Sequence, residues 1–493
     1  AVYELWVQKD RPTFFLEILK KGLLFDKINI ETNRNFNIDE KKNIHFIGIG
    51  GIGMSAIAEI LRSQGHNITG SDMNRNEIVE RLKDKGINVH IGHDRNNVND
   101  VDLVIYTAAI SDENPELIRA KELGIPLISR AEALGLLMRQ KKNSIAVSGT
   151  HGKTTTTSML SLMLRDADYD PTLLIGGNLE ELDGNVRIGK GDYFVTEACE
   201  YMDSFLYLEP KIEIVLNIDS DHLDYFRDID HILESFQKFV GRVPPDGRVI
   251  AYSANPFVNK AVEGMENVIT FGLNEDCDYY AVNIAFDGNG ISKYELYRRG
   301  ESLGTVSMNI PGEYNVLNSL AALACADTLG IDLKIAKSTL SNFQGTQRRF
   351  DIVGTTDKGV KIVDDYAHHP TEIKAALRAA KNIPSKSLWC VFQPHTYTRT
   401  IALFDEFASA FKDADKVIMV EIYAAREKNI NKVSSKLLAD EIKREHPEKD
   451  VYYFETFEEV ANFLFENTHE GDMVITMGAG DVYKIGEMVL EKR

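Results

Sequence analysis

The stretch SGTHGKTTTT, residues 148–157, has the residue types of a loop that binds phosphate groups. Such a loop follows a buried strand, precedes a helix, and holds phosphate oxygens with backbone N–H groups and a lysine. The apolar segment SIAV precedes it here, and Lys153 and Thr154 follow its last glycine. The common motif has a further glycine five positions before Gly152, where this chain has Val147. The spacing still predicts a nucleotide site, with Lys153 on the β and γ phosphates and the Thr154 hydroxyl on Mg²⁺.

Acidic residues follow two further apolar segments and could complete a metal site. Glu197 ends DYFVTEA, and His222 lies among the acids of NIDSDHLD, residues 217–224. Mg²⁺ bound to phosphate takes hard oxygen ligands from neighbouring strand ends. Each acid taken singly could instead cap a helix or remain solvated. The metal prediction therefore depends on the phosphate loop as well as on these acids.

A second glycine-rich turn, GIGGIG, spans Gly48 to Gly53. It matches G-x-G-x-x-G between a predicted strand and helix, and Asp72 ends the next strand about 20 residues on. This pattern is typical of dinucleotide binding and suggests NAD. The physical requirement is weaker, since any nucleotide diphosphate can bind glycine backbone at a helix N-terminus. A tight turn without a ligand is the remaining alternative.

Histidines and arginines gather in a third region, in QRRF (347–350), DDYAHHP (364–370) and QPHTYTRT (393–400). His368 and His395 both follow predicted strands, and Arg349 and Arg399 carry fixed positive charge suited to carboxylates and phosphates. Histidines at strand ends are more often structural than catalytic. These histidines and arginines are candidates for a functional site because they occur together in one region of the chain.

Alternating strands and helices must position these groups. NIHFIGIGG, HNITGSD and DLVIYTAAI are predicted strands, and SAIAEILRSQG is a predicted helix closed by Gly65. The alternation restarts at NSIAVSG and again after QRRF, which predicts βαβ units, parallel sheets and an α/β fold. We predict an N-terminal extension and linker at 1–42 and domains at 43–142, 143–346 and 347–493.

Composition limits the function classes. The formal charge of −19 over 493 residues disfavours nucleic acid and acidic membranes as partners. No apolar stretch approaches the roughly 20 residues of a membrane span. The four cysteines are far apart and form no CxxC pair, as expected in a reducing compartment. The apolar residues between 15 and 22 have helical spacing, which predicts a short amphipathic helix rather than a signal peptide. We therefore expect a cytoplasmic protein without membrane insertion.

Over about residues 43–493 the chain resembles the Mur ligases, the ATP-dependent amino-acid ligases of peptidoglycan precursor synthesis. The resemblance rests on GIGGIGMS, GTHGKTTT, Glu197 with NIDSDHLD, PGEYNVLN, QRRF, DDYAHHPTE and QPHTYTRT in that order and spacing. In this family the phosphate loop is shortened to G-T-x-G-K-T/S, which accommodates Val147. The family's N-terminal domain is Rossmann-like but holds a UDP-sugar, so the resemblance reverses the NAD interpretation.

The resemblance implies three α/β domains: a Rossmann-like N-terminal domain, a P-loop ATPase-like central domain with a mostly parallel sheet, and a Rossmann-like C-terminal domain. It implies ATP and Mg²⁺ as cofactors, and UDP-N-acetylmuramate and L-alanine as substrates that are joined through an acyl phosphate. The implied ATP contacts are Gly149, Thr150, His151, Gly152, Lys153, Thr154, Thr155, Asn315, Asn318, Arg349 and Asp365. The implied substrate contacts are Gly50, Gly51, Ile52, Gly53, Asp72, Asn178, His368, His395 and Arg399. The implied metal ligands are Thr154, Glu197 and His222, and the implied catalytic residues are Lys153, Arg349 and His368.

A histidine near its ordinary pKa of about 6.5 could accept the proton of the attacking amine, and we assign that role to His368. The segment EACEYMDSF departs from the family's EADESD, so Glu197 is carried over and Glu200 is left open. Two alternatives remain. One is a murein-peptide recycling ligase that adds a tripeptide to the same UDP-sugar. The other is a nucleotide-binding switch or an NAD-dependent oxidoreductase, which would act without an amino acid.

Overall fold

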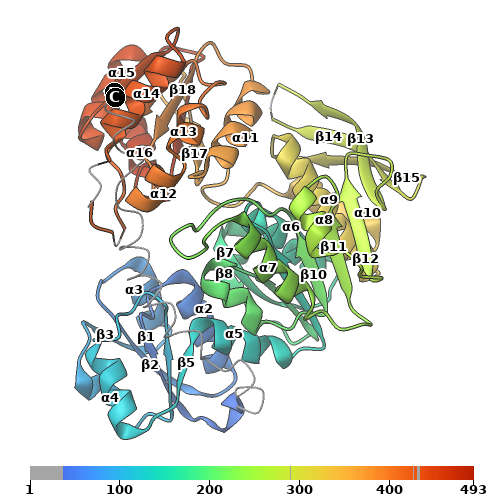
Figure 1. Cartoon of the computed structure of the whole chain (residues 1–493), viewed down its shortest axis with the longest axis vertical. Helices are drawn as coiled ribbons and strands as arrows, with labels where there is room; N and C mark the ends of the chain where they lie inside the picture. Colours follow the sequence, from blue (N-terminus) through green and yellow to red (C-terminus); the bar gives the residue numbers. More distant parts are fainter. Residues whose placement is uncertain (1–36, 289, 426, 430–432, 493) are drawn as a thin grey trace.

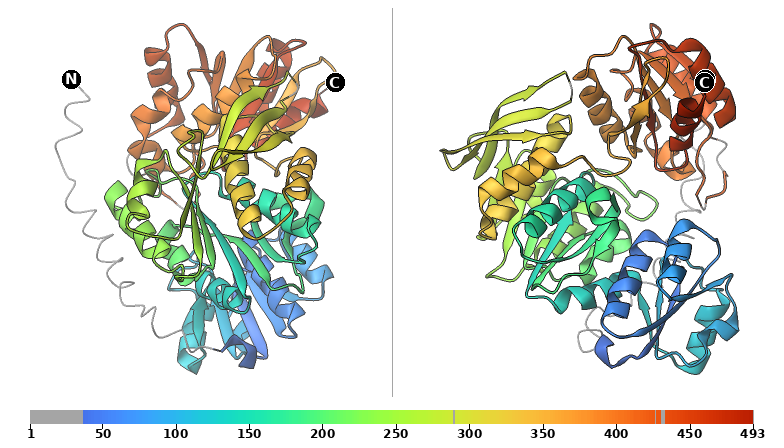
Figure 2. Two further views of the ribbon diagram at one scale, coloured as in Figure 1. Left: turned by 90° about the vertical axis from the view of Figure 1, so that its right-hand side faces the viewer. Right: turned by 180° about the vertical axis from the view of Figure 1, so that it is seen from behind.

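The computed structural model describes residues 37–288, 290–425, 427–429 and 433–492. Within these residues the chain forms three lobes, each built on its own sheet, and the central lobe contacts both of the others (Figures 1 and 2). The amphipathic helix predicted between residues 15 and 22 lies outside the described residues. Among the described helices, none has the length and apolar character needed to cross a membrane.

The N-terminal lobe has a five-stranded parallel sheet in the order β3-β2-β1-β4-β5. This is the strand order of a Rossmann-type sheet, in which the crevice between β1 and β4 opens at the carboxyl ends of the strands. The GIGGIG turn begins there, directly after β1. The elements are η1 (Ile38–Glu40), β1 (Asn43–Ile47), α2 (Ile52–Ser63), β2 (Asn67–Asp72), α3 (Glu77–Asp84), β3 (Asn88–Ile91), η2 (Arg95–Val98), β4 (Leu103–Tyr106), α4 (Pro115–Leu123), β5 (Leu127–Ser129) and α5 (Arg130–Arg139).

The central lobe has a ten-stranded sheet in the order β15-β14-β13-β12-β11-β10-β6-β9-β7-β8. Strands β13, β12, β11, β10, β6, β9 and β7 run parallel to one another, whereas β8 pairs antiparallel with β7, and β14 pairs antiparallel with both β13 and β15. The elements are β6 (Asn143–Ser148), α6 (Lys153–Asp166), β7 (Thr172–Leu179), η3 (Glu180–Leu182), β8 (Gly184–Arg187), β9 (Tyr193–Glu197), η4 (Tyr201–Tyr207), β10 (Ile212–Val215), α7 (Ile229–Val240), β11 (Arg248–Tyr252), α8 (Pro256–Ala261), β12 (Val268–Gly272), β13 (Tyr279–Phe286), β14 (Ser292–Arg298), β15 (Glu301–Met308), α9 (Glu313–Thr328) and α10 (Leu333–Asn342).

The C-terminal lobe has a six-stranded sheet in the order β16-β17-β21-β18-β19-β20, parallel except for β16. Helices cover both of its faces (Figure 1). The elements are β16 (Asp351–Thr355), β17 (Lys361–Asp365), α11 (Pro370–Lys381), β18 (Leu388–Phe392), α12 (Tyr397–Ala402), α13 (Phe404–Ala408), β19 (Lys416–Met419), α14 (Ser435–Glu445), β20 (Asp450–Tyr453), α15 (Phe457–Asn467), β21 (Met473–Met477) and α16 (Tyr483–Glu491).

The sequence explains why these strands lie in the middle of their sheets. Strands β18 and β21 are almost uninterrupted runs of buried apolar residues, and β6 and β10 are buried along nearly their whole length, as expected when helices cover both faces of a parallel sheet. Helix α6 is rich in hydroxyl residues yet buried along most of its length, because it packs between the sheet and α9. Because α6 begins directly after the phosphate loop, its packing in the core fixes the position of that loop.

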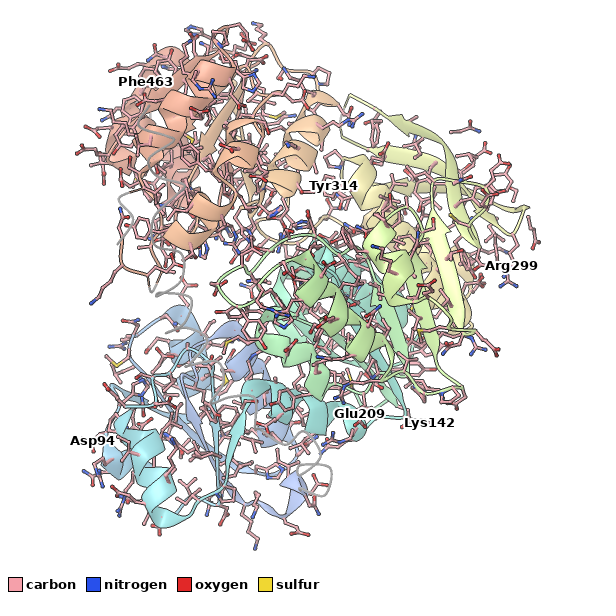
Figure 3. All side chains as sticks on the ribbon, in the orientation of Figure 1. Asp94, Lys142, Glu209, Arg299, Tyr314 and Phe463 are labelled. Atoms are coloured by element: carbon pink, nitrogen blue, oxygen red, sulfur yellow. The ribbon has the colours of Figure 1, made fainter. Side chains whose placement is uncertain are left out.

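The central and C-terminal lobes meet where α9 begins. Tyr314, in the first turn of α9, packs against the apolar core of the C-terminal lobe and lies at the junction of the two lobes (Figure 3). Burial raises the pKa of its phenol.

Candidate active site

The phosphate loop lies between β6 and α6 and is held by one amide. Asn217 accepts a hydrogen bond from the His151 N–H (2.8 Å) and donates one to the His151 carbonyl (3.0 Å). Gly152 has a φ of +85°, and a Cβ there would lie 2.5 Å from the Asn318 side-chain oxygen. Only glycine meets both conditions without strain. The structure thus brings Asn318, a predicted ATP contact, to the phosphate loop.

Lys153 turns back over its own loop. Its ammonium donates to the carbonyls of Gly149 and Thr150 and forms an ion pair of 2.9 Å with Glu200. Burial opposes the charge of Lys153, but Glu200, Cys199 and Glu197 together outweigh it, so the net effect raises the lysine's pKa. Glu200, which the sequence left open, is buried and is the charge partner of the phosphate-loop lysine.

Two of the three predicted metal ligands are in contact. The Thr154 hydroxyl donates to Glu197 Oε2 at 3.1 Å, and the other Glu197 oxygen accepts the Gly176 N–H at 2.6 Å. His222 lies after β10 with a φ of +53°, and its ring packs against Tyr201 with centroids 4.7 Å apart. No hydrogen bond or ion pair joins His222 to Thr154 or Glu197 in the described part of the chain. Left-handed backbone at a non-glycine residue is often found at functional sites.

His151 is held between two carboxylates from different lobes. Its Nε2 lies 3.2 Å from Asp219 of the central lobe, and its Nδ1 lies 3.2 Å from Glu372 in α11 of the C-terminal lobe. Burial alone would lower the pKa of His151, but these two carboxylates raise it to about 9. The same contacts hold the pKa of Asp219 below its usual range. The phosphate loop is therefore tied directly to the C-terminal lobe.

The predicted histidine and arginine set lies at this junction. Arg399 Nε forms an ion pair of 3.0 Å with Asp221, and its Nη1 lies 3.1 Å from His395 Nδ1. The rings of His395 and His368 are 5.9 Å apart. Burial lowers the pKa of His368 to about 4 and that of His395 to about 3. Both rings are therefore neutral at pH 7, and His368 lies well below the ordinary pKa from which its role was predicted.

Asp365 and Arg349 lie near the start of the C-terminal lobe. Asp365 accepts the backbone N–H groups of Phe350 and Ala367, both at 2.7 Å. Burial raises its pKa to about 7, although Arg349 and these bonds favour the carboxylate. The Arg349 guanidinium lies over the Tyr366 ring at 4.9 Å. In this arrangement Asp365 orders the backbone at the end of the segment QRRF.

The remaining predicted ATP and substrate residues have the following surroundings. Asn315 donates to the Pro311 carbonyl (2.8 Å) and accepts from Asn318 (3.2 Å). Asn178 lies exposed on β7, where its carbonyl accepts the Gln347 N–H (3.3 Å). Asp72 accepts the backbone N–H groups of Gly50 (2.9 Å) and Asn74 (3.1 Å). Its carboxylate thus holds the GIGGIG turn in place.

Arg130 was missed by the sequence analysis. It begins α5, and a Cβ added at Gly53 would lie 3.3 Å from its Nη1, so its guanidinium lies over the glycine turn. Among the described residues it forms no hydrogen bond or ion pair. A half-buried cation beside a glycine turn is suited to an anionic group of a ligand. Its position directly after a short strand, in ISRAEAL, was the available signal.

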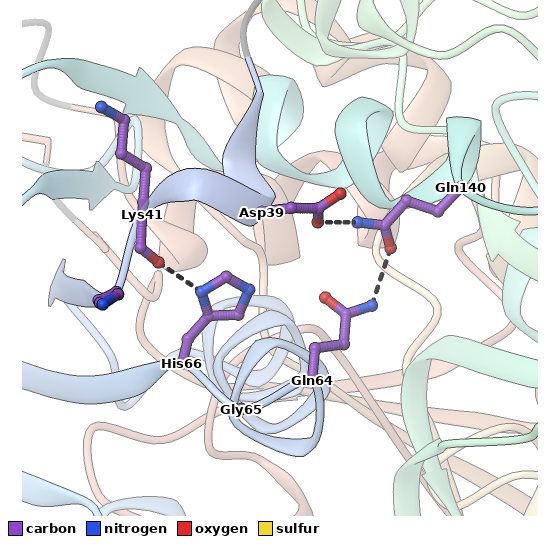
Figure 4. A pocket seen from close by; sticks show the side chains of 7 residues that line it. Asp39, Lys41, Gln64, Gly65, His66 and Gln140 are labelled. Carbon is purple, nitrogen blue, oxygen red and sulfur yellow. Dashed lines mark hydrogen bonds between the residues drawn. The ribbon is translucent and has the colours of Figure 1, made fainter.

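A separate hollow lies at the other end of α2 (Figure 4). It has a volume of about 480 Å³ and is lined by Asp39, Lys41, Lys42, Gln64, Gly65, His66 and Gln140. Gln140 bridges Asp39 (3.0 Å) and Gln64 (2.8 Å). None of the predicted site residues lines this hollow, so it is not part of the candidate active site.

Comparison with known protein families places the three lobes in one family. Residues 43–142 match the family described as "Mur ligase family, catalytic domain", residues 147–326 match "Mur ligase middle domain", and residues 348–480 match "Mur ligase, glutamate ligase domain".

Curated relatives and solved structures agree with this result. The chain is 50% identical over 457 residues to UDP-N-acetylmuramate–L-alanine ligase of Caldanaerobacter subterraneus subsp. tengcongensis, covering 92% of this chain and 99% of the relative. It is 49% identical over 461 residues to the enzyme of that name from Alkaliphilus metalliredigens, covering 93% and 99%. A solved UDP-N-acetylmuramate-alanine ligase from Thermotoga maritima is 30% identical with a TM-score of 0.77, covering 91% of this chain and 98% of that one. A murein peptide ligase from Psychrobacter arcticus is 26% identical with a TM-score of 0.67 and the same coverage.

Proposed function

We propose that this chain, which belongs to the Mur ligase family, joins L-alanine to the lactyl carboxylate of UDP-N-acetylmuramate in an ATP-dependent reaction. The structural observation that supports this most is the junction at Asp221. There the predicted histidine and arginine set of the C-terminal lobe contacts the loop that also holds the phosphate loop. Family membership overturns the NAD-dependent alternative. We propose the domain limits near residues 142 and 346.

The residues at Thr154 suit Mg²⁺. The Thr154 hydroxyl and the Glu197 carboxylate are hard oxygen donors in hydrogen-bond contact beside the phosphate loop, which is the ligand chemistry that Mg²⁺ prefers. We propose that these two oxygens and His222 hold the ion. When bound, the ion neutralises phosphate charge and orients the transferred group.

We propose that the reaction has two steps. The lactyl carboxylate attacks the γ-phosphorus of ATP, which forms an acyl phosphate and releases ADP. The L-alanine amine then attacks the acyl carbon, and inorganic phosphate leaves as the amide forms. Lys153 and Arg349 stabilise the negative charge that develops in the first step. Arg130 binds an anionic group of the UDP-sugar.

His368 is suited to receive the proton released by the amine. Its Nδ1 donates to the Tyr366 carbonyl at 2.9 Å, which leaves the Nε2 lone pair free to accept a proton. Burial keeps the ring neutral at pH 7. A base must be unprotonated when the amine attacks, and His368 satisfies this condition at pH 7; its lowered pKa makes the ring a weaker proton acceptor than an ordinary histidine.

We propose that the C-terminal lobe closes on the central lobe during turnover, with QRRF as the hinge. Arg348 and Phe350 have φ values of +62° and +50°, a left-handed conformation that costs energy in residues with side chains. Hinges often contain a few such positions next to a loop. Closure keeps water away from the acyl phosphate, which would otherwise hydrolyse.

The test is phosphate release from ATP and Mg²⁺ in the presence of UDP-N-acetylmuramate. We expect release to require L-alanine and to be weaker with glycine or L-serine. Lys153→Ala, which removes the phosphate-loop cation, is the inactive control. Release with L-alanyl-γ-D-glutamyl-diaminopimelate in place of L-alanine would instead identify a murein-peptide recycling ligase. If none of the amines tested supports phosphate release, the ligase assignment is refuted.

A further inference from the structure

Two histidines and one aspartate from three separate segments meet outside the predicted magnesium site. His151 belongs to the phosphate loop, Asp219 follows β10, and His369 precedes α11. One ligand atom from each lies within 4.8 Å of the other two. His151 Nε2 is 3.2 Å and His369 Nδ1 is 3.8 Å from the same oxygen of Asp219. The set shares no residue with Thr154, Glu197 and His222.

Both imidazoles are already held by their other nitrogen. His151 Nδ1 faces Glu372 at 3.2 Å, and His369 Nε2 donates to the Ser220 carbonyl at 2.9 Å. Histidines that bind metals almost always donate their second N–H to a carboxylate or a backbone carbonyl. His369 Nδ1 accepts the Thr371 N–H at 3.2 Å, so this atom carries the lone pair. A metal ion would bind the lone pair of His369 Nδ1 in place of the Thr371 N–H.

The ligand types select the class of metal. Zinc with three protein ligands commonly has imidazole and carboxylate donors and an open fourth position. Bonds of about 2.0–2.2 Å in a tetrahedral site place ligand atoms roughly 3.3 Å apart. The distances from Asp219 to His151 (3.2 Å) and to His369 (3.8 Å) are close to this value, whereas the two histidines, whose ligand atoms lie within 4.8 Å of each other, must move closer together. Mg²⁺ and Ca²⁺ prefer oxygen donors throughout. His151 must give up one ring proton when the ion binds, and Asp219 and Glu372, which face this ring, then balance the charge of one divalent ion.

We propose that His151, Asp219 and His369 form a binding site for one divalent transition metal ion of the zinc class, with Glu372 and Ser220 as supporting partners. The ion joins the phosphate loop to the C-terminal lobe, because its ligands come from both lobes. It therefore holds the two lobes together and keeps His151 from rearranging around a nucleotide. Zinc bound at this site inhibits turnover.

The binding test uses the full chain without nucleotide, in metal-free buffer supplemented with excess Mg²⁺ to saturate the magnesium site. Zn²⁺ is titrated against a chromophoric chelator and by calorimetry. We expect one equivalent to bind. His369→Gln and Asp219→Asn should each raise the Kd at least about tenfold, as expected when a ligand is removed. His90→Gln, in β3 of the N-terminal lobe, is the matched control and should bind like the wild type.

Three results would overturn the proposal. They are no stoichiometric binding, unchanged affinity in both ligand variants, or binding that is lost in Glu197→Gln and kept in His369→Gln. The last would place the ion at the magnesium site. Circular dichroism checks that each variant folds. If His369→Gln does not fold, the affinity of Asp219→Asn for zinc and the zinc X-ray absorption spectrum of the wild type test the proposal instead. A spectrum that shows fewer than two imidazole ligands on the zinc refutes the site. The assay does not use ligase activity, so this proposal and the proposed function fail independently.

Discussion

The Asp221–Arg399 ion pair should contribute measurably to catalysis, because it joins the central lobe to the C-terminal lobe. Its Oδ1–Nε distance is 3.0 Å, and both side chains are about nine-tenths buried. At an effective dielectric constant of about 20, two charges at this distance attract by about 5 kcal/mol. Desolvation of both groups offsets much of that energy, so we expect a net coupling of about 2 kcal/mol. That corresponds to a factor of about 30 in a rate or equilibrium constant.

A double-mutant cycle with Asp221→Asn, Arg399→Gln and the combined variant measures this coupling. The readout is kcat/KM for L-alanine from phosphate release. We expect each single variant to lose activity and the double variant to lose about 30-fold less than the product of the two single losses. Arg378→Gln, on the exposed side of α11, is the control and should behave like the wild type. Fully multiplicative losses would show that the pair does not act as a unit and would refute the closure argument.

Three further predictions concern single residues. Arg130→Ala should raise KM for UDP-N-acetylmuramate by about 10-fold or more and leave KM for ATP nearly unchanged, since its guanidinium lies over the glycine turn; an equal rise in both constants in steady-state kinetics would contradict this. Because burial lowers the pKa of His368 to about 4, the acidic limb of kcat due to this base should fall below pH 5, and a limb near pH 6.5 that disappears in His368→Gln would contradict it. Burial raises the pKa of Asp365 to about 7, so its folded state binds a proton more tightly than its unfolded state. The stability this gives is present below about pH 4 and lost as pH rises through 7. The free energy of unfolding should therefore fall as the pH rises from about 4 to about 7 in the wild type, and this fall should be absent in Asp365→Asn, which chemical denaturation at a series of pH values would measure.

The features that the sequence predicted best are local ones at the ends of parallel strands. The phosphate loop directly follows a buried strand, and Glu197 ends the strand that pairs beside it. Because carboxyl ends of parallel strands meet at one edge of a sheet, their contact follows once both strands are recognised. The fold class and the family resemblance were confirmed for the same reason, since both depend on strand–turn–helix units.

The antiparallel strands were not predicted. Strands β14 and β15 contain many polar residues and are only partly buried, so they lack the apolar runs by which the parallel strands were found. Strand β16 is mostly exposed at the edge of its sheet. Edge and meander strands take their stability from pairing with a neighbour, and a single sequence carries little trace of that pairing.

Contacts between lobes could not be predicted from the sequence either. Glu372 approaches His151 across more than 200 positions of the chain, and no periodicity relates the two. Glu372 has a local signature, because with His369 it forms the capping box that starts α11. That signature predicts a helix start and gives no indication of the second role. The lowered pKa of His368 also depends on burial at this junction, which only the folded lobes create.

One short loop, residues 217–222, connects the phosphate site to closure. Asn217 holds the phosphate loop through His151, Asp219 accepts from Thr371 at the start of α11 (2.7 Å), and Asp221 pairs with Arg399. The three residues that make these contacts lie within a span of five residues that follows β10. We expect a nucleotide that shifts the phosphate loop to move Asn217 and, through the same short segment, Asp219 and Asp221. The position of this loop would then couple ATP binding to the approach of the histidine and arginine set, without a separate signalling element.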